Sequence, residues 1–137
     1  MNEKKKFYFT TTLPYVNAEP HIGHALEFLQ ADAIVRFYRK KLGPGSVFFN
    51  LGTDEHGLKI FQKAEEKGIP VKEFTDDNAK KWKEFCKLFN INYDNFYRTS
   101  DKSHYTVAQT FWRKCLSNGD IYKKKYSGLY CVGCEKF

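Results

Sequence analysis

Residues 14–24 read Pro-Tyr-Val-Asn-Ala-Glu-Pro-His-Ile-Gly-His and join two stretches of different character. Residues 7–12, which precede them, are all aromatic or β-branched, as in a buried strand. After them, apolar residues recur at spacings of three and four, which predicts a helix: Leu26, Leu29, Ala33 and Phe37. Pro14 and Pro20 each disfavour helix at the residue before them. The segment is therefore predicted to be a loop that joins a strand to a helix.

Two histidines at the end of this loop, His21 and His24, are candidates for binding phosphate. A helix N-terminus presents unpaired N–H groups and the positive end of the helix dipole, where an anion is stabilised. Imidazoles placed there can donate hydrogen bonds to phosphate oxygens, and the phosphate would favour their protonated form. Gly23 has no side chain, so a base or ribose could lie against its backbone. A His-x-Gly-His tetrapeptide also occurs by chance in surface turns, so the prediction depends on the flanking strand and helix.

A second strand is predicted at residues 46–51, after the breaker Gly43-Pro44-Gly45. Strand, helix and strand then form a βαβ unit, which is right-handed, has parallel strands and binds ligands at their carboxyl ends. Leu13 and Gly52 both lie at such ends. The predicted fold class is therefore α/β, with a parallel sheet and flanking helices.

The chain between this unit and its C-terminal tail is predicted to be mostly helical. A helix is expected at residues 58–67, and a strand-like run at 95–99 precedes another helix at 101–117 that ends at Asn118-Gly119. Between the helix at 58–67 and the strand-like run at 95–99, another helix is indicated by a buried face: Trp82, Phe85, Cys86 and Phe89. Cys86 is expected to act as a small buried hydrophobe. The helix at 101–117 repeats this pattern at Ala108, Phe111, Trp112 and Cys115.

The tail contains a predicted hairpin at residues 121–131 that ends in Cys131-Val132-Gly133-Cys134. A C-x-x-C turn suits zinc because it places two thiolates on one edge of a tetrahedron, with Zn–S bonds of about 2.3 Å. It supplies two of four ligands, and no later Cys or His precedes Phe137. A redox pair and two incidental cysteines are the alternatives. We favour half of a structural zinc site.

Asp54 lies in a second loop, Gly52-Thr53-Asp54-Glu55-His56-Gly57, at the carboxyl end of the second strand. A carboxylate at this position is a suitable partner for an α-ammonium group. It could equally cap the helix that begins near Gly57. His104, in contrast, lies on a predicted helix and is interpreted as a surface or core residue.

Composition limits the function further. The chain has 137 residues, 42% of them hydrophobic, which fits one globular domain. Its net charge of +7 and pI near 9.2 indicate either a polyanionic partner such as RNA or a lysine-rich solvated surface. The basic N-terminus does not lead into a signal-peptide core, and no apolar run reaches the ~18 residues of a membrane span. No membrane association is expected, and the cytoplasm is the expected compartment.

Three stretches together resemble the class I aminoacyl-tRNA synthetases, and specifically the methionyl-tRNA synthetase family: residues 13–24, residues 52–57 and Cys131-x-x-Cys134. The first is similar to that class's HIGH signature, and the resemblance runs from residue 7 to residue 137. It implies the methionine-tRNA ligase reaction, in which ATP with Mg²⁺ activates methionine to methionyl-adenylate and the aminoacyl group passes to tRNA(Met). The protein would position the substrates and stabilise the charge on the five-coordinate phosphorus, without covalent catalysis.

The resemblance also implies roles for individual residues. ATP would be bound by Asn17, His21, Gly23 and His24, with His21 and His24 as the catalytic pair. Methionine would be bound by Leu13, Tyr15 and Asp54, whereas the contacts of Glu55 and His56 in the same loop are less certain. Zn²⁺ would be held by Cys131 and Cys134 as half of a site.

Domain organisation is expected to follow the same resemblance. Residues 1–120 would form the N-terminal half of the nucleotide-binding catalytic domain, with the first half of a class I synthetase Rossmann-like parallel sheet. Residues 121–137 would form the start of a truncated connective-peptide zinc knuckle. The family's Lys-Met-Ser-Lys-Ser loop, second nucleotide-fold half and anticodon-binding domain are missing from this sequence. The remainder of the synthetase polypeptide is thus an expected partner, and the isolated chain is expected to be inactive. The alternative is a non-catalytic nucleotide- or RNA-binding module built on the same half-fold.

Overall fold

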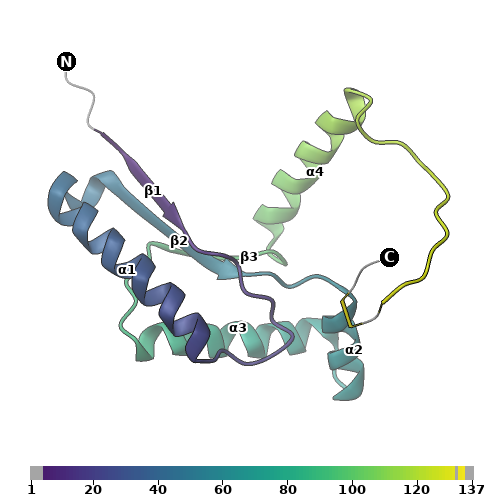
Figure 1. The fold of residues 1–137 in the computed structure, drawn as a ribbon, viewed down its shortest axis with the longest axis horizontal. Helices are drawn as coiled ribbons and strands as arrows, with labels where there is room; N and C mark the ends of the chain where they lie inside the picture. Colours follow the sequence, from purple (N-terminus) through teal and green to yellow (C-terminus); the bar gives the residue numbers. More distant parts are fainter. Residues whose placement is uncertain (1–4, 132, 135–137) are drawn as a thin grey trace. The chain divides into compact units, whose positions relative to one another are not determined.

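A computed structural model describes residues 5–131 and 133–134. Three strands form a parallel sheet in the order β1-β2-β3: β1 (Phe7–Thr10), β2 (Val47–Thr53) and β3 (Asn95–Arg98). Helix α1 (Ile22–Leu42) and a 3₁₀ turn, η1 (Pro44–Ser46), connect β1 to β2. Helices α2 (Leu58–Glu66) and α3 (Val71–Leu88) connect β2 to β3, and α4 (Lys102–Ser117) follows β3 (Figure 1). The predicted βαβ unit is confirmed.

The chain divides into two compact units, Met1–Tyr105 and Thr106–Phe137, so that the boundary falls within α4. The first unit contains the sheet with α1, α2 and α3. The second contains most of α4 and the tail. No helix in the described part of the chain is long and apolar enough to cross a membrane.

The core of the first unit lies on one face of the sheet. Its β2 residues alternate: Val47, Phe49 and Leu51 are buried, whereas Phe48 is exposed. The three buried β2 residues are covered by buried side chains of α1, α2 and α3: Phe28, Val35, Ile60, Ala64, Phe74, Trp82 and Cys86. On the other face, Tyr8 stacks on Phe48 with 5.9 Å between ring centroids, and both remain exposed. The period-two alternation of the strands therefore places one aromatic pair outside this core.

Helix α1 begins and runs as predicted, but its buried face is not the stripe that predicted it. Leu26 is 62% exposed and Phe37 is 58% exposed. The helix instead packs through a neighbouring stripe: Ala25, Phe28, Ala31, Asp32 and Val35. Helical spacing identifies a helix, but in a helix that is apolar on two sides it does not identify which side is buried.

The stripe predicted on α3 is confirmed, since Trp82 and Cys86 are fully buried and Phe85 and Phe89 pack against the core. Burial raises the pKa of the Cys86 thiol to about 12. Cys86 is therefore the small buried hydrophobe that was expected, and not a reactive thiol.

Within the second unit, the predicted apolar face of α4 is exposed. Phe111 is 69% exposed and Trp112 is 60% exposed, so the expectation of a repeated buried face is wrong for this unit. Gly119, at φ +82°, ends the helix as predicted, and the Asp120 N–H donates to the Cys115 carbonyl. Residues 120–130 contain no helix or strand, so the predicted hairpin is also wrong. Two isolated strands are marginally stable without a third strand or a helix to pack against.

Candidate functional site

The loops that follow β1, β2 and β3 lie at the carboxyl-terminal edge of the sheet. A parallel bridge pairs Tyr15 with Asp54, and the Asp54 N–H donates to the Pro14 carbonyl at 2.9 Å. The Val16 N–H in turn donates to the Asp54 carbonyl at 3.1 Å. The structure therefore brings together the two sequence motifs, which lie some thirty residues apart in the chain. This edge is where ligands bind in open parallel sheets.

His21 and His24 cap the N-terminus of α1 through their own ring nitrogens. His21 is the N-cap residue, and its Nδ1 accepts the Gly23 N–H at 3.1 Å. His24 Nδ1 accepts the His21 N–H at 3.2 Å, which closes a reciprocal capping box. The ring centroids lie 3.9 Å apart. The tetrapeptide therefore has a structural role in addition to any role in ligand binding.

This capping decides which nitrogens remain available to a ligand. Because each Nδ1 accepts a backbone N–H, the neutral ring carries its proton on Nε2. Burial lowers the pKa of His24, and the charge of His21 lowers it further. Without a ligand, burial thus favours the neutral form of His24, with its proton on Nε2. The sequence predicted the protonated form only beside a phosphate.

Trp82 links His24 to the core. The two rings meet edge to face with 4.6 Å between their centroids, and Trp82 is 1% exposed. Among the described residues its Nε1 has no hydrogen-bond partner. The sequence identified Trp82 as a core residue, and the structure adds that it supports one of the site histidines.

The loop from residue 11 to residue 20 is tied to two helices. Glu27 of α1 accepts hydrogen bonds from the Thr12 N–H and hydroxyl at 2.9 and 2.8 Å. Glu19 pairs with Lys81 of α3 at 2.5 Å, and both ends of this pair are partly exposed. Asn17 lies in the turn between these anchors and is half-buried. The predicted nucleotide-binding residues are thus held at one end of α1.

The predicted methionine-binding residues Leu13, Tyr15 and Asp54 are also close together. Two glycines of the second loop make this packing possible, because a Cβ on Gly57 would collide with the Tyr15 hydroxyl and one on Gly52 would collide with the Tyr97 carbonyl. Gly57 also has φ +134°, a conformation that other residues rarely adopt. Tyr15 can therefore cross the second loop only because residue 57 is glycine.

Asp54 does not cap α2. Gly57 is the N-cap of that helix, which has no side-chain cap hydrogen bond. Asp54 Oδ1 accepts long hydrogen bonds of 3.4 Å from the His56 N–H and from Thr99 Oγ1. Of the two roles considered for this carboxylate, capping is excluded by the geometry.

Glu55, next to Asp54, makes contacts that the sequence did not predict. Its carboxylate is bound by Arg98, with Nε···Oε1 at 2.7 Å and Nη2···Oε2 at 2.9 Å. Ser100 Oγ donates to the same carboxylate. No local pattern singled out Arg98 or Ser100, because their partner lies more than forty residues earlier in the chain.

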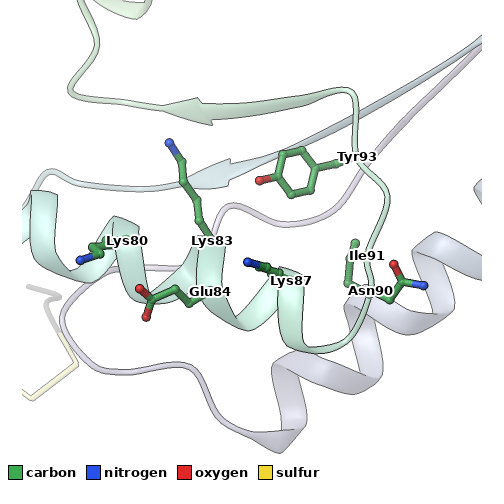
Figure 2. Close-up of a pocket in the computed structure, with 7 residues that line it drawn as sticks. All are labelled: Lys80, Lys83, Glu84, Lys87, Asn90, Ile91 and Tyr93. Atoms are coloured by element: carbon green, nitrogen blue, oxygen red, sulfur yellow. The ribbon is translucent and has the colours of Figure 1, made fainter.

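A cavity of about 450 Å³ borders this cluster, and its lining includes His56, Asp76 and Tyr105. Another concavity, of about 470 Å³, lies on α3, where Lys80, Lys83 and Lys87 surround it with Tyr93 (Figure 2). Lys83 Nζ lies 5.2 Å from the Phe96 ring centroid. This second concavity adjoins the segment that enters β3, so it is at the amino-terminal end of that strand and apart from the site.

Within the second unit, Cys131 and Cys134 are both exposed, and the Cys134 N–H donates to Cys131 Sγ at 3.4 Å. The described residues contain no cluster of three or more potential metal ligands. The second half of the predicted zinc site is therefore not found in the part of the chain that the structure covers.

Residues 7–137 match the family model described as tRNA synthetases class I (M). The chain belongs to the class I (M) tRNA synthetase family. Among its relatives, the methionine-tRNA ligase of Clostridium acetobutylicum is 46% identical over 100% of this chain and 21% of its own length. The corresponding ligase of Thermotoga maritima is 48% identical over 96% of this chain and 21% of its own length.

The fold of the chain is also similar to solved structures of tRNA synthetases. The Mycobacterium tuberculosis methionyl-tRNA synthetase in complex with methionyl-adenylate matches with a TM-score of 0.89 at 41% identity, over 94% of this chain and 25% of that one. The chain thus spans about a fifth to a quarter of the relatives it matches. The expected class I fold is confirmed, as is the resemblance stated from the sequence.

Proposed function

We propose that this chain is part of the catalytic domain of a methionine-tRNA ligase. In this role it would contribute to the ATP-dependent activation of methionine to methionyl-adenylate and to the transfer of methionine to tRNA(Met). The observation that carries the proposal is the junction of the two motif loops through the Tyr15 and Asp54 backbones. Its fold is shared, at 41% identity, with a synthetase whose structure holds methionyl-adenylate.

The proposed ATP-binding residues are Asn17, His21, Gly23 and His24. His21 and His24 would donate from Nε2 to phosphate oxygens, because each Nδ1 is already used in the cap. As the five-coordinate phosphorus forms, these donors would stabilise the charge that develops on its oxygens.

The proposed methionine-binding residues are Leu13, Tyr15 and Asp54. Asp54 would accept hydrogen bonds from the α-ammonium group, since its carboxylate is half-buried and its contacts in the free protein are long. Leu13 and Tyr15 would contact the substrate side chain. The carboxylate of methionine would then attack the α-phosphorus, and pyrophosphate would leave.

Two metals belong to the proposal. Mg²⁺ would neutralise charge on the phosphates of ATP, bound through the substrate more than through protein side chains. Zn²⁺ would be bound by Cys131 and Cys134 as thiolates, with two further ligands from outside the described residues. Its contribution would be structural, and no step of the reaction depends on it.

Further polypeptide is proposed to complete the enzyme. Domain assignments follow the sequence: residues 1–120 would be half of the nucleotide-binding domain and residues 121–137 the start of the connective knuckle. Exposed apolar residues such as Leu26, Phe37 and Phe48 support a surface that other parts of a synthetase would cover. We also propose the cytoplasm as the compartment, because the proposed reaction, the charging of tRNA, occurs there.

The test compares the 137-residue chain with a full-length synthetase that carries it. The chain alone should bind ATP weakly, measured by NMR titration, and show no methionine-dependent exchange of pyrophosphate into ATP. The full-length enzyme should catalyse that exchange. Robust exchange by the chain alone would refute the need for further polypeptide. Absence of exchange in the full-length enzyme, with ATP binding retained, would favour the non-catalytic nucleotide-binding module.

A further inference from the structure

The side chain of Glu55 is completely buried beside the proposed methionine-binding carboxylate. Arg98 donates one hydrogen bond to each of its oxygens. Thr53 Oγ1 donates to Oε1 at 2.7 Å, and Ser100 Oγ donates to Oε2. A carboxylate has about four acceptor positions, and these four bonds use all of them. Glu55 therefore has no acceptor position left with which to bind a substrate.

Arg98 extends the same cluster to a helix. It is the last residue of β3, and its Nη2 also donates to Asp76 Oδ1 of α3 at 2.7 Å. Its hydrogen bonds to Glu55 and Asp76 raise the pKa of Arg98, which keeps the guanidinium charged. The planar, bidentate pairing fixes the orientation of the carboxylate as well as its position. One side chain thus joins the loop after β2 to β3 and α3.

Backbone contacts hold the loop on both sides of Asp54. The Thr99 N–H donates to the Thr53 carbonyl at 3.2 Å, and the Glu55 N–H donates to Thr99 Oγ1 at 2.8 Å. His56 Nε2 lies 3.1 Å from the Thr99 carbonyl. Asp54 is therefore between fixed neighbours, while its own carboxylate makes only the long contacts described above.

Stability alone is a poor explanation for such a pair. The free energy needed to remove two charges from water offsets much of the attraction between them. Well-packed hydrophobic residues can therefore often replace a buried ion pair without loss of stability. A bidentate pair does provide a single, defined geometry for the backbone that carries it. We propose that Glu55 and Arg98 are positioning residues, whose ion pair fixes residues 53–57 so that Asp54 can bind the methionine ammonium group.

This inference rests on the proposed function for its substrate, but the fixing of the loop can be tested without it. In the 137-residue chain, we would measure amide hydrogen exchange for Glu55→Gln and for the matched control Glu66→Gln. Glu66 forms an exposed pair with Lys63 on α2. Exchange at the Asp54 and residue 55 amides should rise at least about tenfold in Glu55→Gln, as expected for a lost charge-assisted hydrogen bond. Core amides of α1, and every amide in the control, should be unchanged.

The second test uses a full-length synthetase that carries this segment. Glu55→Gln and Arg98→Met should raise the KM for methionine by up to about 10²-fold, the effect of misplacing a binding group by about 1 Å. The KM for ATP should stay within about twofold of wild type, because these substitutions do not disturb the cap of α1, where ATP is proposed to bind. Arg98→Lys should recover part of the loss. The control Lys72→Met, which removes an exposed partner of Asp76, should behave as wild type.

The outcomes separate the two proposals. Unchanged exchange at the loop amides in Glu55→Gln would overturn the positioning role, whatever the enzyme does. Equal losses for methionine and ATP, together with faster exchange throughout the core, would also overturn it and indicate a purely structural pair. A wild-type enzyme without methionine-dependent activity would refute the proposed function. Amide hydrogen exchange in residues 53–57 would then still decide whether the ion pair of Glu55 and Arg98 fixes this loop.

Discussion

Replacing His21 by asparagine should separate its capping role from its proposed role toward phosphate. His21 caps α1 through Nδ1, which accepts the Gly23 N–H at 3.1 Å. The Oδ1 atom of asparagine stands at the same number of bonds from Cα and can accept the same N–H. Asparagine is also among the best N-cap residues. His21→Asn therefore keeps the cap and loses the Nε2–H donor.

The two roles predict different magnitudes. His21→Ala should lower the free energy of unfolding by about 1 kcal/mol, the usual effect of losing an N-cap, whereas His21→Asn should change it by less than about 0.5 kcal/mol. In a full-length enzyme, both variants should lower the adenylation rate by about 10²–10³, the effect of deleting one preorganised donor, or ~2.7–4 kcal/mol. The affinity for methionine in the ground state should hardly change.

Urea unfolding of the 137-residue chain measures the first quantity, and methionine-dependent pyrophosphate exchange in the full-length enzyme measures the second. If His21→Asn retains the wild-type exchange rate, the donor role is refuted and the histidine is only a cap. If His21→Asn destabilises the chain as much as His21→Ala, the capping geometry described here is wrong.

Further predictions concern the neighbouring charge and the thiols. In the full-length enzyme, Asp54→Asn should weaken methionine binding by about 1.5–3 kcal/mol, as for a lost charge-assisted bond, and ATP binding much less; equal losses in calorimetry would contradict the proposed role. Folding lowers the pKa of His24 below the 6.5 of the unfolded chain, so its contribution to stability is present above that pH and lost as the pH falls through the folded pKa. His24→Gln, which can keep the capping box, should therefore lose less stability than wild type in urea unfolding below pH 6.5; equal losses would contradict this. Native Cys86, with its pKa near 12, should resist alkylation at pH 8 while the exposed Cys134 reacts, as mass spectrometry would show.

The sequence predicted the order and type of most elements because those signals are local. The aromatic and β-branched run at residues 7–12, the Gly43-Pro44-Gly45 breaker and the helical spacings each act over a few residues. Where a helix had two apolar faces, the spacing of its apolar residues did not show which face is buried. Helix α1 is apolar on two sides, and only packing against β2 and α3 decided that Phe28 is buried and Leu26 is not.

The predicted hairpin after residue 120 illustrates a second limit. Alternating residues with a Ser127-Gly128 turn satisfy the local rules for two strands, yet the described residues 120–130 form none. A strand pair gains most of its stability from what covers its apolar face. Local pattern cannot report whether such a partner is present.

The sequence by itself determined the motifs and the family, because His21, His24 and Asp54 lie in short, contiguous stretches that can be read without the fold. Tertiary structure alone decided what each group can do. It assigned the two Nδ1 atoms to capping, excluded Asp54 as a cap of α2 and placed Glu55 in a buried pair with Arg98. The physical reason is that hydrogen-bond capacity is used up by partners that meet only in the folded chain, and a sequence does not show which partners those are.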